Sequence, residues 1–163
     1  AEPLWVENAV RSMTTLSRTA AEIITQADGV HSMTDITGFG LMGHGREMAM
    51  ASGVTLEIEV EAVPRIDGAL EAVRRAAIPA GLLANREFAE CVIAESPESH
   101  ISADSRTLMF DPQTSGPLLI SVAAESAGSL LDSLHRAGLT AEKIGRVLGV
   151  YAAGSGKPAI ILR

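Results

Sequence analysis

Residues 34–44 read Thr-Asp-Ile-Thr-Gly-Phe-Gly-Leu-Met-Gly-His, and this stretch decides how the chain around it is organised. An extended run, residues 30–35, is predicted before it, and a helix through Leu41 and Met48 after it. The glycines between them allow the backbone to turn sharply and to approach a ligand closely. The pattern therefore places a carboxylate, Asp35, at the end of a strand and beside a helix N-terminus.

Asp35 is the first candidate site residue. A helix N-terminus offers free amide donors and a favourable field for an anion, and Mg²⁺ often takes one or two carboxylates together with substrate phosphates. Asp35 therefore suits a metal that bridges to a nucleotide phosphate, with Thr37, Gly38 and Gly40 shaping the loop. The local sequence alone favours a plainer interpretation, in which Asp35 caps the next helix. For His44, it favours a capping or packing hydrogen bond over catalysis.

A second polar stretch, Asp-Pro-Gln-Thr-Ser-Gly at residues 111–116, has strong turn chemistry between two apolar runs. One interpretation is a loop that faces a ligand or a partner domain through Gln113, Thr114 and Ser115. The local sequence favours the other interpretation, an ordinary solvated turn.

The periodicity of the remaining chain predicts the other elements. Residues 7–27 recur at helical spacing, and residues 54–60 alternate as in a strand with one face on a core and one in water. Further helices are predicted at 66–77, 86–94 and 126–137, and further strands at 108–110, 118–122, 144–150 and 159–162. Since strands and helices are mixed without strict alternation, we expect an α+β domain with one mixed sheet covered by helices.

Composition limits the class of protein. The 163 residues, 47% of them apolar, are enough for a single domain with its own core. No apolar run is long enough to span a membrane, and a net charge of −7 argues against binding to nucleic acid. A single cysteine excludes a disulfide framework within the chain and a multi-cysteine zinc site, and is compatible with a reducing compartment such as the cytoplasm.

Two apparent signals are set aside. Gly156-Lys157 is similar to the end of a phosphate-binding loop, but Tyr151 stands where that motif needs a glycine and Pro158 where it needs Ser or Thr. The segment is interpreted as a hairpin turn between the last two strands. Cys91 lies among apolar residues, which predicts a buried, inert thiol.

Taken in order, these stretches resemble the selenophosphate synthetase (selenide, water dikinase) family over nearly the whole chain. The family pattern T-D-V-T-G-F-G-L-x-G-H, E-M, V-P, P-G-G-x-x-x-N and D-P-Q-T-S-G-G-L-L has counterparts here in residues 34–44, 47–48, 63–64, 79–85 and 111–119. Asn85 is the last residue of the fourth element. Pro117 and Ala80 replace glycines of the pattern, and Ser17 stands where an asparagine is common.

The resemblance implies a superfamily of ATP-using enzymes that includes aminoimidazole ribonucleotide synthetase and a hydrogenase maturation protein. Residues 1–163 would be the C-terminal domain, a three-layer α/β/α unit. The absent N-terminal domain would dimerise, bind most of the ATP and carry the catalytic Cys or selenocysteine. The implied reaction converts ATP, selenide and water to selenophosphate, AMP and phosphate with Mg²⁺, and Asp35 matches a metal ligand of the family. The alternatives are another enzyme of the superfamily and a non-catalytic docking module.

Overall fold

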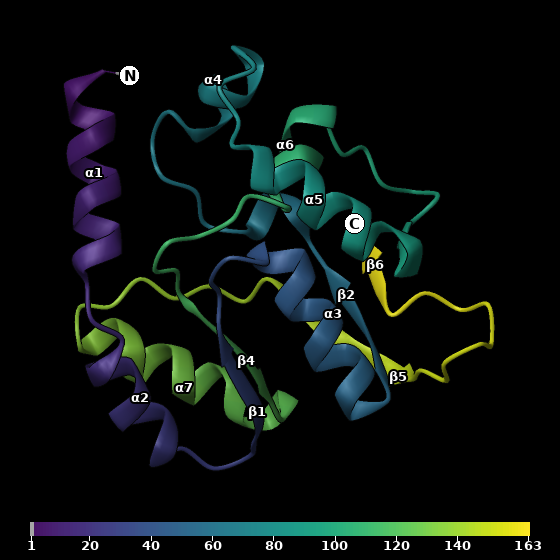
Figure 1. Cartoon of the computed structure of the whole chain (residues 1–163). Helices are drawn as coiled ribbons and strands as arrows, with labels where there is room; N and C mark the ends of the chain where they lie inside the picture. Colours follow the sequence, from purple (N-terminus) through teal and green to yellow (C-terminus); the bar gives the residue numbers. More distant parts are fainter. Residues whose placement is uncertain (1) are drawn as a thin grey trace.

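The computed structural model describes residues 2–163 and has a mixed four-stranded sheet, a separate two-stranded sheet and helices packed around both (Figure 1). The α+β class is therefore confirmed, although the strands divide between two sheets. The helices are α1 (Pro3–Thr14), α2 (Arg18–Thr25), α3 (Gly40–Ser52), α4 (Ala69–Arg74), α5 (Ala80–Ala89), α6 (Ala103–Leu108) and α7 (Ala124–Arg136), with 3₁₀ turns η1 (Val60–Ala62) and η2 (Glu90–Val92). The strands are β1 (Val30–Asp35), β2 (Val54–Ile58), β3 (Ile93–Glu95), β4 (Leu118–Val122), β5 (Gly145–Val150) and β6 (Ile160–Leu162).

The four-stranded sheet has the order β3-β6-β2-β5, with β6 parallel to β2 and to β3, and β5 antiparallel to β2. The expected hairpin between β5 and β6 is therefore wrong, because β2 lies between them and residues 151–159 form a crossover. Gly154 and Gly156 still turn the chain, with φ of 80° and 74°. Ile160 and Leu162 are fully buried. They are covered because β6 lies between β3 and β2, whereas a hairpin with the exposed β5 would not have buried them.

Strand β2 does not have the solvent-facing side that its alternation predicted. Thr55 and Glu57 are buried together with the apolar residues of the strand. The Thr55 hydroxyl donates to the carbonyl of Pro158 at 3.0 Å, and the Arg146 Nε donates to a Glu57 carboxylate oxygen at 2.7 Å. Because β2 is an inner strand, its polar side chains form their hydrogen bonds with neighbouring segments of the chain. On a solvent-exposed face, water would form these hydrogen bonds instead.

The helix predicted at 7–27 is two helices, α1 and α2, broken at residues 15–17. The hydroxyls of Thr14 and Thr15 donate to the carbonyls of Val10 and Arg11, both at 2.8 Å, and Thr15 is extended. Side-chain donors that compete for backbone carbonyls favour a helix end, a signal that the apolar spacing does not contain.

Residues 80–110 also differ from the prediction. Helix α5 starts at Ala80, directly after the extended Pro79, and the chain returns to a strand, β3, before residue 94. Residues 108–110 are not a strand, because α6 extends through Leu108. That helix is set by its cap: the Ser102 hydroxyl accepts from the Ser105 backbone N–H at 3.0 Å.

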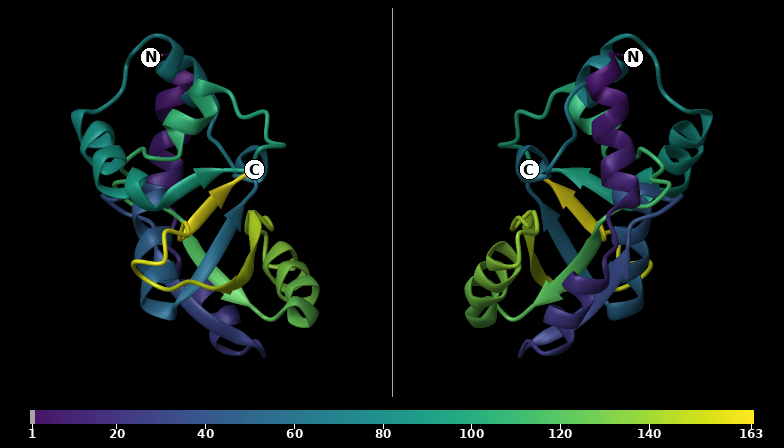
Figure 2. Two further views of the ribbon diagram at one scale, coloured as in Figure 1. Left: turned by 90° about the vertical axis from the view of Figure 1, so that its right-hand side faces the viewer. Right: turned by 90° about the vertical axis from the view of Figure 1, so that its left-hand side faces the viewer.

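Two cores hold the sheets in place, besides a further buried cluster of Ala49, Leu56 and Ala159. One lies between the four-stranded sheet and helices α3, α5 and α6, around Phe110, Met42 and Leu82. The other joins α2 and α7 to the β1–β4 pair around Ile24 and Leu130, and Figure 2 shows this second group beside the four-stranded sheet. No helix within residues 2–163 is long and apolar enough to cross a membrane.

Candidate functional site

The two polar motifs lie side by side at one end of the β1–β4 pair. The pair is antiparallel, with Asp35 opposite Leu118, so the loop after β1 (residues 36–39, the first loop) meets the loop before β4 (residues 109–117, the second loop). Three backbone hydrogen bonds join the loops: Ile36 N–H to Pro117 O at 2.9 Å, Gly116 N–H to Ile36 O at 3.0 Å, and Gln113 N–H to Thr37 O at 3.0 Å. Pro117 contributes its carbonyl here, so this contact does not need the N–H that proline lacks.

Gly40 allows α3 to start against the second loop. Its φ is +67°, and a Cβ there would lie 2.7 Å from the carbonyl oxygen of Asp111. Gly38 differs, because a Cβ built on it would meet no atom within 4 Å. The backbone is therefore closely packed at Gly40, where α3 begins, and open at Gly38 in the first loop.

The side chain of Asn85, in α5, forms hydrogen bonds with both loops. It is buried, and its Nδ2 donates to the carbonyls of Gly38 at 2.9 Å and Phe110 at 3.0 Å. Since both partners are backbone carbonyls, which only accept, the amide nitrogen must face them. One residue of the first loop and one of the second are thus held by the same side chain.

His44 anchors the first loop from α3. Its Nε2 lies 3.1 Å from both the backbone nitrogen and the hydroxyl of Thr37. A backbone N–H can only donate, so Nε2 is an acceptor and the ring proton is on Nδ1. The structure therefore gives His44 the packing hydrogen bond that the sequence favoured.

Asp35 does not cap α3, whose N-cap is Phe39 without a side-chain cap bond. Its side chain is exposed, and the carboxylate makes no hydrogen bond or ion pair with the rest of residues 2–163. Thr114 and Ser115 of the second loop are exposed as well. These polar groups face solvent at the junction of the two loops.

The first turn of α3 is less open to an anion than the sequence predicted. The Gly40 amide donates to the Thr37 carbonyl at 2.9 Å, and the Met42 amide donates to the Met109 carbonyl at 3.2 Å. Because the second loop uses one of these amides and the first loop another, the helix N-terminus mainly holds the two loops together.

Asp111 is the titratable group of the second loop. Burial raises the pKa of its carboxyl, and a hydrogen bond from the Gln113 Nε2 to Oδ2, at 2.7 Å, acts in the opposite direction. The side chain of Gln113 is thus directed to its own loop.

The residues of this chain can supply only part of a metal site. Within residues 2–163, no group of three or more His, Cys, Asp and Glu side chains could hold a metal ion. The exposed carboxylate of Asp35 nevertheless has the chemistry and the accessibility of a single magnesium ligand. The remaining ligands would have to come from phosphates, water or another part of the protein.

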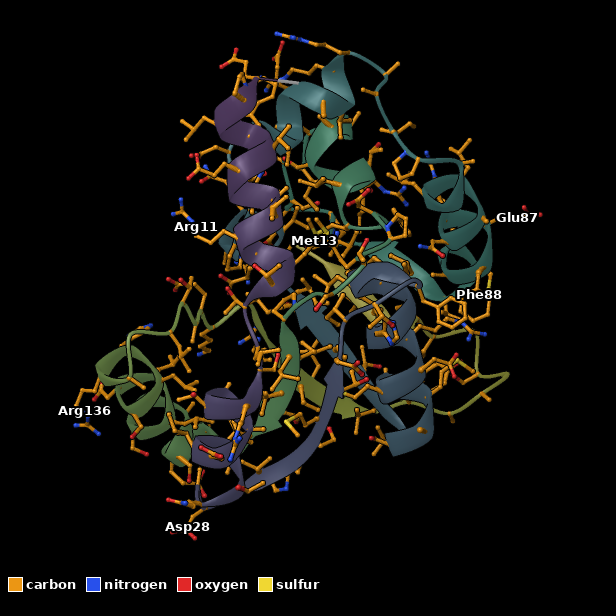
Figure 3. The ribbon with its side chains drawn as sticks, turned by 60° about the vertical axis from the view of Figure 1, so that its left-hand side comes forward. Arg11, Met13, Asp28, Glu87, Phe88 and Arg136 are labelled. Carbon is orange, nitrogen blue, oxygen red and sulfur yellow. The ribbon has the colours of Figure 1, made fainter. Side chains whose placement is uncertain are left out.

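Two aromatic residues near the site were not identified from the sequence. Phe39 of the first loop and Phe88 of α5 are 54% and 40% exposed, and their rings stack with centroids 5.6 Å apart. The Arg46 guanidinium lies 4.2 Å from the Phe88 ring centre, and Figure 3 shows Phe88 at the outer side of α5. The position of Phe39 between two glycines was the available signal. Cys91, predicted to be buried, is exposed, because it lies in the 3₁₀ turn that ends α5.

Comparison with known families gives a match over most of the chain. Residues 6–153 match the family model described as AIR synthase related protein, C-terminal domain. The chain is 44% identical over 146 residues to selenide, water dikinase 2 of Peptoclostridium acidaminophilum, covering 87% of this chain and 40% of that protein. It is 40% identical over 147 residues to selenide, water dikinase of Geobacter metallireducens, covering 90% of this chain and 41% of that protein.

Among solved structures, the chain is similar to a hydrogenase maturation protein, HypE. The TM-score is 0.56 at 20% identity, and the match covers 91% of this chain and 38% of the other. At that identity the likeness supports the fold alone. In each of these comparisons the chain spans about 40% of the length of the protein that it matches.

Proposed function

The chain belongs to the family of AIR synthase related protein C-terminal domains, and from this premise we propose that it is the C-terminal domain of a selenide, water dikinase. The relatives at 40–44% identity that carry this name support the proposal. So does the order of motifs, from the first loop through Asn85 to the second loop. The observation that carries it is the exposed carboxylate of Asp35 where the two loops meet, which has no partner among residues 2–163.

In this proposal the full-length protein converts ATP, selenide and water to selenophosphate, AMP and phosphate. Because the chain spans about 40% of its relatives, the remaining part would carry the nucleophile and most of the ATP site, and would form the homodimer. The single cysteine of this chain fits the reducing conditions of the cytoplasm.

Asp35 would supply one ligand to Mg²⁺ on the ATP phosphates. When bound, that ion offsets the negative charge of the transferring phosphoryl group. The residues of this chain orient the carboxylate: β4 pairs with β1 as far as Asp35, and His44 and Asn85 hold the loop that follows. A ligand that comes from a second domain couples the closure of the domains to the assembly of the site.

The test is selenide-dependent formation of AMP from ATP by the full-length parent protein, with and without Asp35→Asn. We expect the variant to fold normally and to lose at least about 100-fold in turnover, since even the outer partners of metal ligands are worth 10–100-fold. The matched control is Asp28→Asn, an exposed carboxylate beyond the opposite end of β1 (Figure 3). It is expected to retain full activity.

The outcomes separate the proposal from its alternatives. ATP turnover without selenide dependence in an intact parent would assign the chain to another enzyme of the superfamily. Full activity of Asp35→Asn would reject the metal role and leave the family assignment standing. An active parent that needs neither Asp35 nor the two loops would make the chain a docking module.

A further inference from the structure

We propose that Asn85 is a positioning residue for the metal-binding carboxylate: its amide locks the first loop to the second and so determines how Asp35 is presented. This inference rests on the proposed function, which makes Asp35 a ligand, and adds a residue that never touches the metal. It starts from the contrast between the buried amide of Asn85 and the exposed carboxylate that it would position.

The Asn85 amide nitrogen is fully used between the loops. Both hydrogens of Nδ2 are directed to backbone carbonyls, Gly38 in the first loop and Phe110 at the start of the second. A buried polar side chain is retained only where its hydrogen bonds are made, because an unpaired buried amide is unfavourable. A leucine has the same branched heavy-atom skeleton and would form neither bond. The asparagine is therefore explained by the loop geometry and not by the core alone.

The position of this contact is what links it to Asp35. The carboxylate has no partner of its own in residues 2–163, so its direction depends on the backbone at the end of β1. That backbone continues into the first loop, where a Cβ at Gly38 would meet no atom within 4 Å. The hydrogen bond from Asn85 to the Gly38 carbonyl is the side-chain contact that restrains this open residue. The bond to Phe110 ties it to the rigid core, in which the Phe110 ring is fully buried.

The experiment compares two variants of the full-length parent protein. Asn85→Leu keeps the branched heavy-atom skeleton of the side chain and removes both donors. Ala89→Gly, at the buried last residue of α5, weakens the same helix, because it removes a buried methyl group and because glycine loses more conformational freedom on folding, but it leaves the amide in place. A positioning role predicts that Asn85→Leu raises the half-saturating Mg²⁺ concentration about 10-fold, the usual effect of groups that orient metal ligands. At saturating Mg²⁺ the kcat should change less than about 3-fold.

Two further measurements do not depend on turnover. Direct titration with Mn²⁺ should show weaker binding to Asn85→Leu than to the parent or to Ala89→Gly. Amide hydrogen exchange should become faster at residues 36–40 and 109–113 in Asn85→Leu alone. A merely structural role predicts instead that the two variants change metal affinity equally for an equal loss of melting temperature, and that result would overturn the proposal.

The failure of this inference can be distinguished from the failure of the proposed function. If the parent forms no AMP from ATP in the presence of selenide, the proposed function is rejected, and the exchange and Mn²⁺ measurements still decide the role of Asn85. If the parent is active but Asn85→Leu has unchanged half-saturation and unchanged loop exchange, only the positioning role is rejected.

Discussion

Asp111 lies half-buried in the second loop, where its carboxyl accepts a hydrogen bond from Gln113. Because burial disfavours the charged form, the pKa of Asp111 is raised above that of the unfolded chain. The folded state then binds the proton more tightly than the unfolded state. The stability that this contributes is fully present below the unfolded pKa, near 4, and is lost as the pH rises through the folded pKa.

Asp111→Asn is therefore expected to raise the free energy of unfolding at pH 7, because it removes the buried charge while keeping an acceptor for Gln113. The gain should shrink as the pH falls and should vanish near pH 3, where the aspartate is protonated in both states. Urea unfolding at pH 7, 5 and 3 measures it. Asp132→Asn, at an exposed position of α7, is the control and should change stability little. An Asp111→Asn variant that is less stable at pH 7 would contradict the prediction.

Asp35 and Asp111 show how two carboxylates of adjacent loops differ at this scale. Asp111 is partly shielded from water and paired within its loop, whereas Asp35 is exposed and has no partner in the described part of the chain, residues 2–163. An exposed carboxylate is free to bind a cation without first breaking a bond in the protein. This difference, which the residue types do not reveal, is why the site is built on Asp35.

At the scale of elements, the first turn of α3 depends on its contact with the second loop. Gly40→Ala places a Cβ 2.7 Å from the Asp111 carbonyl and forces alanine to adopt a φ of +67°. We expect a loss of roughly 2–3 kcal/mol in the free energy of unfolding, since such backbone strain costs of order 1–3 kcal/mol before any steric overlap. Chemical denaturation followed by circular dichroism measures the loss.

Gly128→Ala in α7 is the matched control for this variant. A Cβ at Gly128 would meet no atom within 4 Å, and alanine is favoured over glycine in a helix by roughly 0.5–1 kcal/mol. The control should therefore become more stable. If Gly40→Ala unfolded at the same denaturant concentration as the original chain, the close packing of α3 on the second loop would be disproved.

The elements differ in how far the sequence could predict them. β1, α3, β4 and α7 were predicted close to their observed bounds, because glycine or turn residues mark their ends and each has its own periodicity. The break between α1 and α2 was missed because threonine hydroxyls, and not a change in apolar spacing, end the first helix. The strand predicted at 108–110 failed because the cap at Ser102 starts a helix that ends at Leu108, and a turn at Met109 and Phe110 follows it.

At the scale of the whole molecule, the chain corresponds to only part of the length of its relatives, and this predicts what it can do alone. As about 40% of their length, with one exposed carboxylate as its candidate ligand, residues 1–163 alone should form no AMP from ATP and selenide and should bind ATP very weakly. Calorimetry and a nucleotide assay on the purified chain measure both. Substantial turnover by the chain alone would contradict the proposed division of the active site.

The arrangement of the sheets is where the whole molecule departed most from the local pattern. The alternation in β2 correctly predicted a strand, but it also predicted a solvent-exposed face. The glycines at 154 and 156 correctly predicted a turn, but they also suggested a hairpin. Both errors have one cause. β2 lies between β5 and β6, and no local pattern states which strands will be neighbours.

The sequence by itself determined the α+β class, the strand, glycine turn and helix around Asp35, the turn at residues 111–116 and the family resemblance, because local periodicity, glycine geometry and turn chemistry act over a few residues. Only the tertiary structure decided that the two polar loops meet, that Asn85 bonds to both, that Asp35 is exposed while Asp111 is partly buried, and that β2 is an inner strand. These features depend on strand pairing, burial and hydrogen bonds between residues far apart in the chain, and such contacts are determined only when the whole core packs.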